Sequence, residues 1–233
     1  MSLLHTETLP CPFCGAEAER EIANSVAAVR RPDLRAAILD GSFQKIVCDS
    51  CGKTFRINPT LTYMDTGRGT WILTLPCDKR PLWDSFESGA LSIFNDSFGA
   101  NAPPAARGLG KRLRPRVTFG WTGLREKLLC EEYAIDDTTL ELLKLLLLRT
   151  TEAGNLTENA ALRLIARNEA GDLVMAWLSD ATEGGTEIIE VPASLLADIA
   201  GDKAWDAARA ELSNGPFVDA GKLLVSPELP IPA

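Results

Sequence analysis

Four cysteines in two matching pairs are the residues of this sequence best suited to chemistry. The pairs are Cys11 with Cys14 and Cys48 with Cys51. Two intervening residues let one tight turn aim both sulfurs at a common point, and two such turns complete a tetrahedral set of thiolates. Gly15 and Gly52 follow the pairs and suit the positive φ of such a knuckle, and Pro12 stiffens the first turn. The spacing predicts one structural metal ion held by four cysteines.

Other uses of paired cysteines fit this pattern less well. A thioredoxin-like redox site has a single pair near a βαβ pattern, whereas this chain has two pairs without one. A disulfide framework belongs to secreted chains, and no charged-then-apolar leader precedes Cys11. Zinc is the first expectation for the metal, with iron as the alternative, because rubredoxin-like iron sites use similar knuckles. We expect Lys45 and Lys53 to offset the net charge of about −2 on such a centre.

The segment between the two cysteine pairs is long enough to contain a secondary-structure element of its own. Its 33 residues exceed the spacing of about 15–20 that is usual in a zinc ribbon. Residues 31–33 (Arg-Pro-Asp) are typical of a helix start, and Leu34, Ile38 and Leu39 share one face before Gly41 ends the pattern. We therefore predict a zinc-ribbon-like N-terminal module with a short helix inserted between its knuckles.

These motifs resemble the CpXC domain family, which is named for its two Cys-Pro-x-Cys motifs. The likeness rests on Cys11-Pro12-Phe13-Cys14-Gly15, on the run from Cys48 to Phe55, and on Val117–Gly120 leading through Leu124 and Lys127 to Leu148. It covers roughly residues 8–150. The family is bacterial and archaeal and has no characterised function, so the resemblance implies a metal site and no activity. One departure is Asp49, where the family usually has proline, and we expect it to loosen the second turn.

Strand and helix signals follow one another along the rest of the chain and predict the α+β class. After the knuckles we expect a hairpin over Thr60–Asp65 and Thr70–Leu75, extending the sheet of the ribbon, helices over 81–98, 123–133 and 136–151, and a strand over Arg116–Trp121. Farther on we expect strands over 161–168, 173–180, 187–191 and 217–225 in a small antiparallel sheet, short helices over 195–199 and 205–212, and a loose tail over 226–233.

Length and composition are those of an ordinary globular chain. The 233 residues allow one large or two small domains, and 45% of them are hydrophobic. We predict a metal-binding module over 8–78, a helical region over 79–152 that contains a basic loop at 99–116, and a C-terminal α+β region over 153–233. The longest apolar run, Leu145–Leu148, is too short for a membrane span, so we expect a cytoplasmic protein with no membrane partner.

Charge is distributed unevenly along the chain. Residues 101–130 carry seven basic side chains and one acidic one, whereas residues 131–233 carry seven basic and 19 acidic ones. The basic segment can contact an anionic partner or dock on the acidic C-terminal part, and the net charge of −8 favours docking. The candidate anion-binding residues are Arg107, Lys111, Arg112, Arg114 and Arg116.

The remaining residues favour a protein that is not an enzyme. The single histidine, His5, lies in an N-terminus that we expect to be frayed, so no histidine-based catalytic site can be built. Four thiolates also close the metal's coordination sphere. Two hypotheses follow. The first is a zinc-binding interaction or scaffold protein with a protein partner or self-association. The second is a nucleic-acid-associated zinc-ribbon protein that contacts phosphates through residues 107–116.

Overall fold

The computed structural model describes residues 2–58, 60–150, 160–179 and 185–224. They form a mixture of helices and several sheets, which is compatible with the α+β class. The chain divides into two compact units, one made of residues 1–82 and 88–121 and the other of residues 83–87 and 122–233. Across the described ranges, the helices are too short or too polar to cross a membrane.

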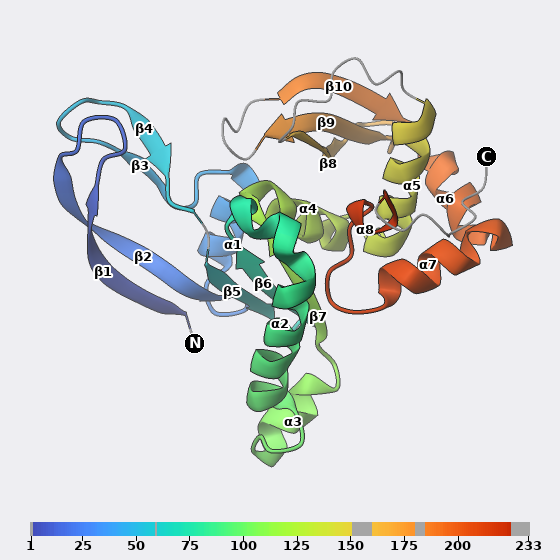
Figure 1. Cartoon of the computed structure of the whole chain (residues 1–233), viewed down its shortest axis with the longest axis horizontal. Helices are drawn as coiled ribbons and strands as arrows, with labels where there is room; N and C mark the ends of the chain where they lie inside the picture. Colours follow the sequence, from blue (N-terminus) through green and yellow to red (C-terminus); the bar gives the residue numbers. More distant parts are fainter. Residues whose placement is uncertain (1, 59, 151–159, 180–184, 225–233) are drawn as a thin grey trace. The chain divides into compact units, whose positions relative to one another are not determined.

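A five-stranded sheet is the frame of the first unit (Figure 1), with the strand order β1-β2-β5-β6-β7. The strands are β1 (Leu3–Pro10), β2 (Glu17–Ala27), β5 (Leu61–Asp65), β6 (Thr70–Leu75) and β7 (Arg114–Phe119). The pairs β1·β2 and β5·β6 are antiparallel, whereas β2·β5 and β6·β7 are parallel. The predicted β5–β6 hairpin is confirmed, and the mixed sheet around it was not predicted.

The first two strands form a long hairpin that carries the first cysteine pair in its turn. Only Ser25, Val26 and Ala27 of β2 pair with β5, so the remainder of the hairpin extends as a two-stranded ribbon (Figure 1). His5 lies within β1, and the expectation of a frayed N-terminus there is therefore wrong. The strand signal was weak because β1 has little buried surface: its residues from Leu3 to Thr8 are exposed.

The second cysteine pair lies in a separate, smaller hairpin. Between the pairs stands α1 (Pro32–Asp40), which has proline in its first turn and ends at Gly41 in the left-handed conformation, as predicted. β3 (Lys45–Val47) and β4 (Thr54–Arg56) then pair as a two-stranded antiparallel sheet around the second knuckle. β5 and β6 extend the sheet of the first-knuckle hairpin, since β5 pairs with β2, but they do not extend the β3–β4 sheet of the second knuckle.

The basic segment 99–116 is more ordered than the expected loop. A 3₁₀ helix (Cys77–Leu82) and α2 (Trp83–Phe98) precede it, and it contains α3 (Pro104–Gly110) and the start of β7. β7 begins two residues before the predicted strand. Pro115 lies opposite Trp71 in it, which is possible because β7 is the last strand of the sheet.

The core of the first unit lies under β5, β6 and β7. Tyr63, Trp71 and Val117 are at most 2% exposed, and the Trp71 ring meets Phe94 of α2 edge-on at 5.4 Å. Trp71 is thus a core residue. All six residues of β6 are buried, whereas β5 alternates between buried and half-buried positions, so β6 is covered on both faces.

The second unit combines a three-stranded antiparallel sheet with short helices. The sheet has the order β10-β9-β8, formed by β8 (Ala160–Arg167), β9 (Leu173–Ser179) and β10 (Gly185–Val191). The helices are α4 (Gly120–Glu132), α5 (Asp137–Thr150), α6 (Ala193–Gly201), a 3₁₀ turn (Lys203–Trp205), α7 (Asp206–Ser213) and α8 (Gly221–Leu224). The predicted strands and helices up to Leu212 are confirmed. Asp136 caps α5 by accepting bonds from the backbone N–H and hydroxyl of Thr139.

The strand predicted over 217–225 is wrong. Residues 217–220 are buried; among them only Phe217 makes a single β-bridge, no strand of the predicted length is present in the described part of this range, and α8 follows them. Charged side chains form hydrogen bonds with the backbone of this segment. Glu87 accepts from the N–H of Phe217, Lys127 donates to the carbonyl of Val218, and Glu141 accepts from the N–H of Ala220. The predicted loose tail, 226–233, lies outside the described residues.

Candidate metal centre

The two cysteine pairs lie in turns with the same backbone geometry. In the first, the N–H of Gly15 donates to the carbonyl of Cys11 at 2.9 Å, and in the second the N–H of Gly52 donates to the carbonyl of Cys48 at 2.8 Å. Both glycines have positive φ, +73° and +70°, as predicted for the ends of such knuckles. The second turn is closed as tightly as the first, so Asp49 does not loosen it.

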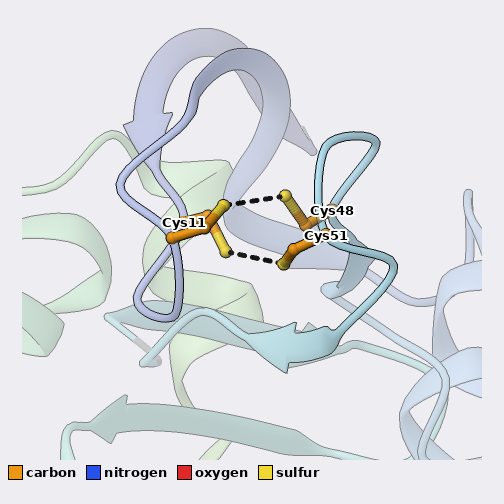
Figure 2. A group of neighbouring side chains, drawn as sticks. Cys11, Cys48 and Cys51 are labelled. Carbon is orange, nitrogen blue, oxygen red and sulfur yellow. Dashed lines mark hydrogen bonds between the residues drawn. The ribbon is translucent and has the colours of Figure 1, made fainter.

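The four sulfurs meet at one point between the two turns. Figure 2 shows Cys11 on one loop facing Cys48 and Cys51 on the other. The Sγ atoms of Cys11 and Cys51 are 3.8 Å apart, and those of Cys14 and Cys48 are 3.7 Å apart. All four Sγ atoms lie within 4.8 Å of one another. Four sulfurs bound tetrahedrally at 2.3 Å from Zn²⁺ would be about 3.8 Å apart, so this cluster has the size and donor set to hold a metal ion.

The four thiols differ in their burial and in the hydrogen bonds that they accept. Cys11 and Cys48 are 4% and 5% exposed, whereas Cys14 lies at the surface. The backbone N–H groups of Cys51 and Ser50 lower the pKa of Cys48 to about 6. At Cys14 the N–H of Ala16 lowers the pKa, but desolvation and the three other thiols together raise it to about 12. Four thiolates this close repel one another, and a divalent cation would remove that repulsion.

A contact between charged side chains joins the two halves of the site. Arg20 of β2 donates from Nη2 to Oδ2 of Asp49, which directly follows Cys48. Both residues line a small pocket of about 70 Å³ beside Cys11 and Cys48. The hairpin that carries the first knuckle is therefore tied to the second knuckle by an ion pair as well as by the cysteines.

One of the two lysines expected to offset the thiolate charge has a different contact. The amine of Lys53 lies over the ring of Phe13, 4.9 Å from its centroid, and the Lys53 carbonyl accepts from the N–H of Cys48. Phe13 itself is 54% exposed in the first knuckle. This cation–π contact spans the two knuckles on the surface, and Arg20 is the cation that contacts the second knuckle directly.

The candidate anion-binding residues are spread over three kinds of structure. Arg107 lies on α3 and bonds the carbonyl of Ala100, Lys111 and Arg112 follow that helix, and the others lie in β7. Arg107, Lys111, Arg112 and Arg114 are exposed, whereas Arg116 is half-buried and bonds the carbonyl of Pro115. The segment thus presents four exposed cations; whether they bind an anion stays a prediction.

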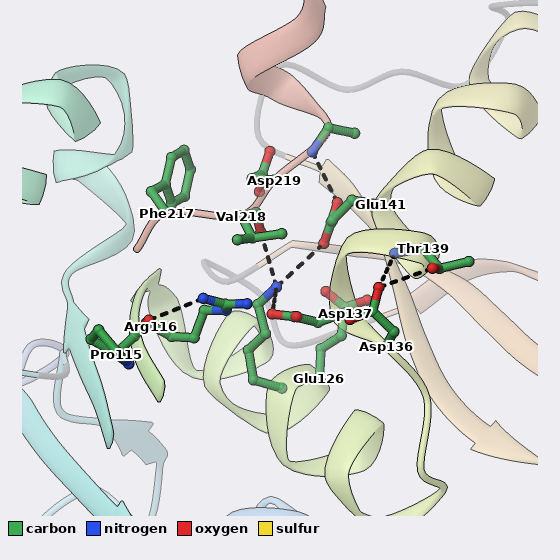
Figure 3. A network of polar contacts seen from close by, with 12 residues as sticks. Pro115, Arg116, Glu126, Asp136, Asp137, Thr139, Glu141, Phe217, Val218 and Asp219 are labelled. Atoms are coloured by element: carbon green, nitrogen blue, oxygen red, sulfur yellow. Dashed lines mark hydrogen bonds and ion pairs between the residues drawn. The ribbon is translucent and has the colours of Figure 1, made fainter. Parts of the chain in front are cut away.

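Sequence reasoning missed a second polar cluster, which lies inside the second unit. It consists of Glu126, Lys127, Asp137, Glu141, Lys144, Arg163 and Asp219, each at most 6% exposed. Figure 3 shows several of these residues converging between α4, α5 and the segment before α8. Glu141 and Lys144 belong to this cluster although they lie in the leucine-rich helix α5. Leucine spacing alone could not reveal partners that lie up to 79 residues away.

Each charge of this cluster has an oppositely charged neighbour. Lys144 Nζ lies 2.6 Å from Glu126 and 2.8 Å from Glu141, Arg163 Nη1 lies 2.8 Å from Glu126, and Lys127 Nζ lies 3.0 Å from Asp137. Burial raises the pKa of Glu126, but Lys144 and Arg163 outweigh it and the net pKa is lowered. Such mutual pairing satisfies the charges within the fold, which indicates a structural role.

Comparison with known proteins agrees with the cysteine motifs. A family model described as CpXC protein matches residues 9–144, which is more than half of the chain and includes both knuckles. No curated protein and no solved structure matches this chain. Because the match includes all four cysteines and extends to Lys144 of α5, the chain belongs to the CpXC protein family.

Proposed function

We propose that this chain is a zinc-binding, non-catalytic interaction or scaffold protein whose N-terminal part works as a zinc-ribbon-like module. The observation that carries the proposal is the meeting of four Sγ atoms within 4.8 Å, brought together by two turns of equal geometry. Cys11, Cys14, Cys48 and Cys51 are the proposed ligands. Zinc is preferred to iron because it needs no redox partner, although both metals accept four thiolates.

A structural role for the metal follows from the number of ligands. Four thiolates fill a tetrahedral coordination sphere, so no position remains for a water molecule or a substrate. What the metal supplies is folding energy, on the order of 10–16 kcal/mol for zinc-finger peptides. Here that energy would hold the β1–β2 hairpin against the β3–β4 hairpin, which has only two strands of three residues each.

The proposed partner is another protein or a second copy of this chain. The overall charge of −8 disfavours polyanions, and a rigid, metal-closed pair of hairpins offers a fixed surface for recognition. The reducing cytoplasm is the proposed location, because it keeps such cysteines available to a metal.

The test uses the full chain, purified with its metal. Wild type, Cys48→Ser and the control Cys77→Ser would be compared by light scattering on a sizing column and by crosslinking in lysate, with crosslinked proteins identified by mass spectrometry. We expect wild type and the control to show the same partner or the same self-association, and Cys48→Ser to lose it. A wild-type chain that is strictly monomeric and crosslinks to no protein would refute the interaction function.

Nucleic-acid binding is the second candidate, and one observation favours it. Arg107, Lys111, Arg112 and Arg114 are exposed within a span of eight residues. Binding of fluorescent DNA and RNA, single- and double-stranded, at low and physiological salt tests it. Affinity that falls steeply with salt and is lost when these four residues become alanine would support phosphate contacts. The absence of nucleic-acid binding at low salt would leave the protein-interaction function as the remaining candidate.

A further inference from the structure

The outer edge of β1 is an open side of the five-stranded sheet. β1 pairs with β2 on one side, and no other strand of the described residues pairs with it. Its residues from Leu3 to Thr8 are exposed. An eight-residue strand of this kind presents a row of backbone N–H and C=O groups to which another extended segment can bond.

A bulge and a proline, two features that protect edge strands, are confined to the two ends of β1, and Glu7 is the one acidic residue between them. A register shift lies between Leu3 and Leu4, and Pro10 closes the strand at the knuckle. Between them the sequence His-Thr-Glu-Thr contains neither proline nor lysine, which are the residues that usually prevent pairing at an edge. The middle of β1 therefore remains able to accept a strand.

The two faces of the β1–β2 hairpin differ in cover and charge. Glu17, Glu19 and Glu21 of β2 are exposed, whereas Ala18 and Arg20, which alternate with them, are half-buried. Ala18 and Arg20 line the pocket at the second knuckle, and Glu17, at the knuckle end of β2, borders the same pocket. One face is thus covered near the knuckle by the second loop. The other is open, and we call it the acidic face.

The acidic face reaches the open edge through small residues. In the register of the hairpin, Thr6 lies opposite Glu21 and Thr8 opposite Glu19. A strand added beside β1 would lie two strand spacings, about 10 Å, from β2. A lysine or arginine side chain can extend over a threonine and meet a glutamate across that distance. Arg31 acts on Glu21 through its charge, which leaves Glu17 and Glu19 as the main carboxylates.

We propose that the open edge of β1 binds an extended peptide segment with lysine or arginine at alternate positions, which adds to the sheet as a further strand. Its basic side chains would lie over the acidic face, while its backbone bonds β1. The inference rests on the proposed interaction function and names its surface and the chemistry of its partner. A nucleic acid is disfavoured at this place, because exposed carboxylates repel phosphates.

The first test uses the full, metal-loaded chain and fluorescein-labelled eight-residue peptides in anisotropy titrations. One peptide alternates lysine with threonine, a second alternates glutamate with threonine, and a third is the lysine peptide with N-methyl groups on alternate backbone amides. We expect the lysine peptide to bind at least tenfold more tightly than the other two, and its affinity to fall as salt rises. Equal binding of the lysine and glutamate peptides, or no binding of either, would overturn the proposal.

Variants then locate the binding surface. Combined Glu17→Gln and Glu19→Gln should weaken the lysine peptide about tenfold, and Thr8→Lys should abolish binding by placing a charge at the edge. Glu7→Gln removes one carboxylate charge from the other face of the hairpin, where Glu7 lies opposite Arg20, and should change affinity less than twofold. If the combined glutamine variant binds the lysine peptide as tightly as wild type does, the acidic face is not part of the binding surface.

Two control measurements keep this proposal distinct from the proposed function. If the metal-loaded Thr8→Lys variant crosslinks to a protein partner as well as metal-loaded wild type does, the edge of β1 is not the docking site, but the interaction function stands. If wild type is a dimer that Thr8→Lys converts to a monomer, the occupant is a second copy and the peptide proposal is wrong.

Discussion

The guanidinium of Arg20 and the carboxylate of Asp49 are 2.5 Å apart, and they connect the hairpin of the first knuckle to the turn of the second. Asp49 occupies the position in its turn that Pro12 occupies in the first one. Proline stiffens the first turn by its ring, whereas the second turn gains a contact across the site. The two knuckles thus reach the same backbone geometry by different means.

We predict that breaking this pair speeds metal loss without preventing metal binding. Asp49 is 78% exposed at its side chain, so the pair should contribute about 0.2–1 kcal/mol. Arg20→Gln and Asp49→Asn should each raise the rate of zinc release to a coloured chelator by up to about fivefold, and the double variant should release zinc no faster than either one. Arg31→Gln breaks the exposed pair with Asp33 and serves as the control. Fully additive effects would contradict the contact.

The glycines that follow the two cysteine pairs should resist substitution for conformational reasons alone. An added Cβ at Gly15 or Gly52 meets nothing within 4 Å, but both residues have positive φ. Gly15→Ala and Gly52→Ala should therefore each lower stability by about 1–2 kcal/mol in urea denaturation. Gly89→Ala, in the middle of α2 with equally open space, should instead stabilise by up to about 1 kcal/mol. A loss at Gly89 as large as at the knuckles would contradict this reasoning.

The buried charges of the second unit predict opposite responses to acid at two glutamates. The pKa of Glu126 is lowered and that of Glu141 is raised, the latter by burial first and by Asp219 among its neighbours. A lowered pKa gives stability that is present above the unfolded value near 4.5 and is lost as pH falls below it. A raised pKa costs stability at neutral pH, and that cost disappears as pH falls through the folded value.

Urea denaturation of Glu126→Gln and Glu141→Gln between pH 7 and pH 3 checks these signs. Glu126→Gln should cost about 3 kcal/mol or more at pH 7, because Lys144 and Arg163 lose a buried partner, and the cost should shrink towards pH 3. The cost of Glu141→Gln should grow over the same range. Acid release of the metal affects both variants and wild type alike, so it cancels in the differences. Costs that change in the same direction would refute the assignment.

The cysteine site and much of the secondary structure could be predicted because their signals are local. The C-x-x-C spacing, the proline and glycine around α1, and the alternation in β5 each lie within a few residues. By contrast, β2 was missed because its charged residues, such as Glu19 and Glu21, lie in an exposed hairpin that produces no hydrophobic period.

The errors near the C-terminus have a different cause. Phe217 and Val218 have the composition of a strand, but their backbone groups bond to Glu87 and Lys127, which lie 130 and 91 residues away in the sequence. Likewise, Glu141 in a leucine-rich run looks like an exposed residue until α4 and the segment before α8 surround it. Such partners are set by tertiary packing, which a single sequence does not display.

Metal content of the purified full chain tests the central claim most directly. Mass spectrometric metal analysis should find one zinc per wild-type chain and one in the control Cys77→Ser, whose sulfur lies outside the cluster. Cys14→Ser or Cys48→Ser should hold little zinc and should melt at a lower temperature, because three thiolates bind the ion less tightly and the hairpins lose their connection. Finding iron in place of zinc would change the identity of the metal but would leave the four-cysteine site as proposed. Equal metal content and equal melting in wild type and the Cys48→Ser variant would contradict the four-cysteine centre.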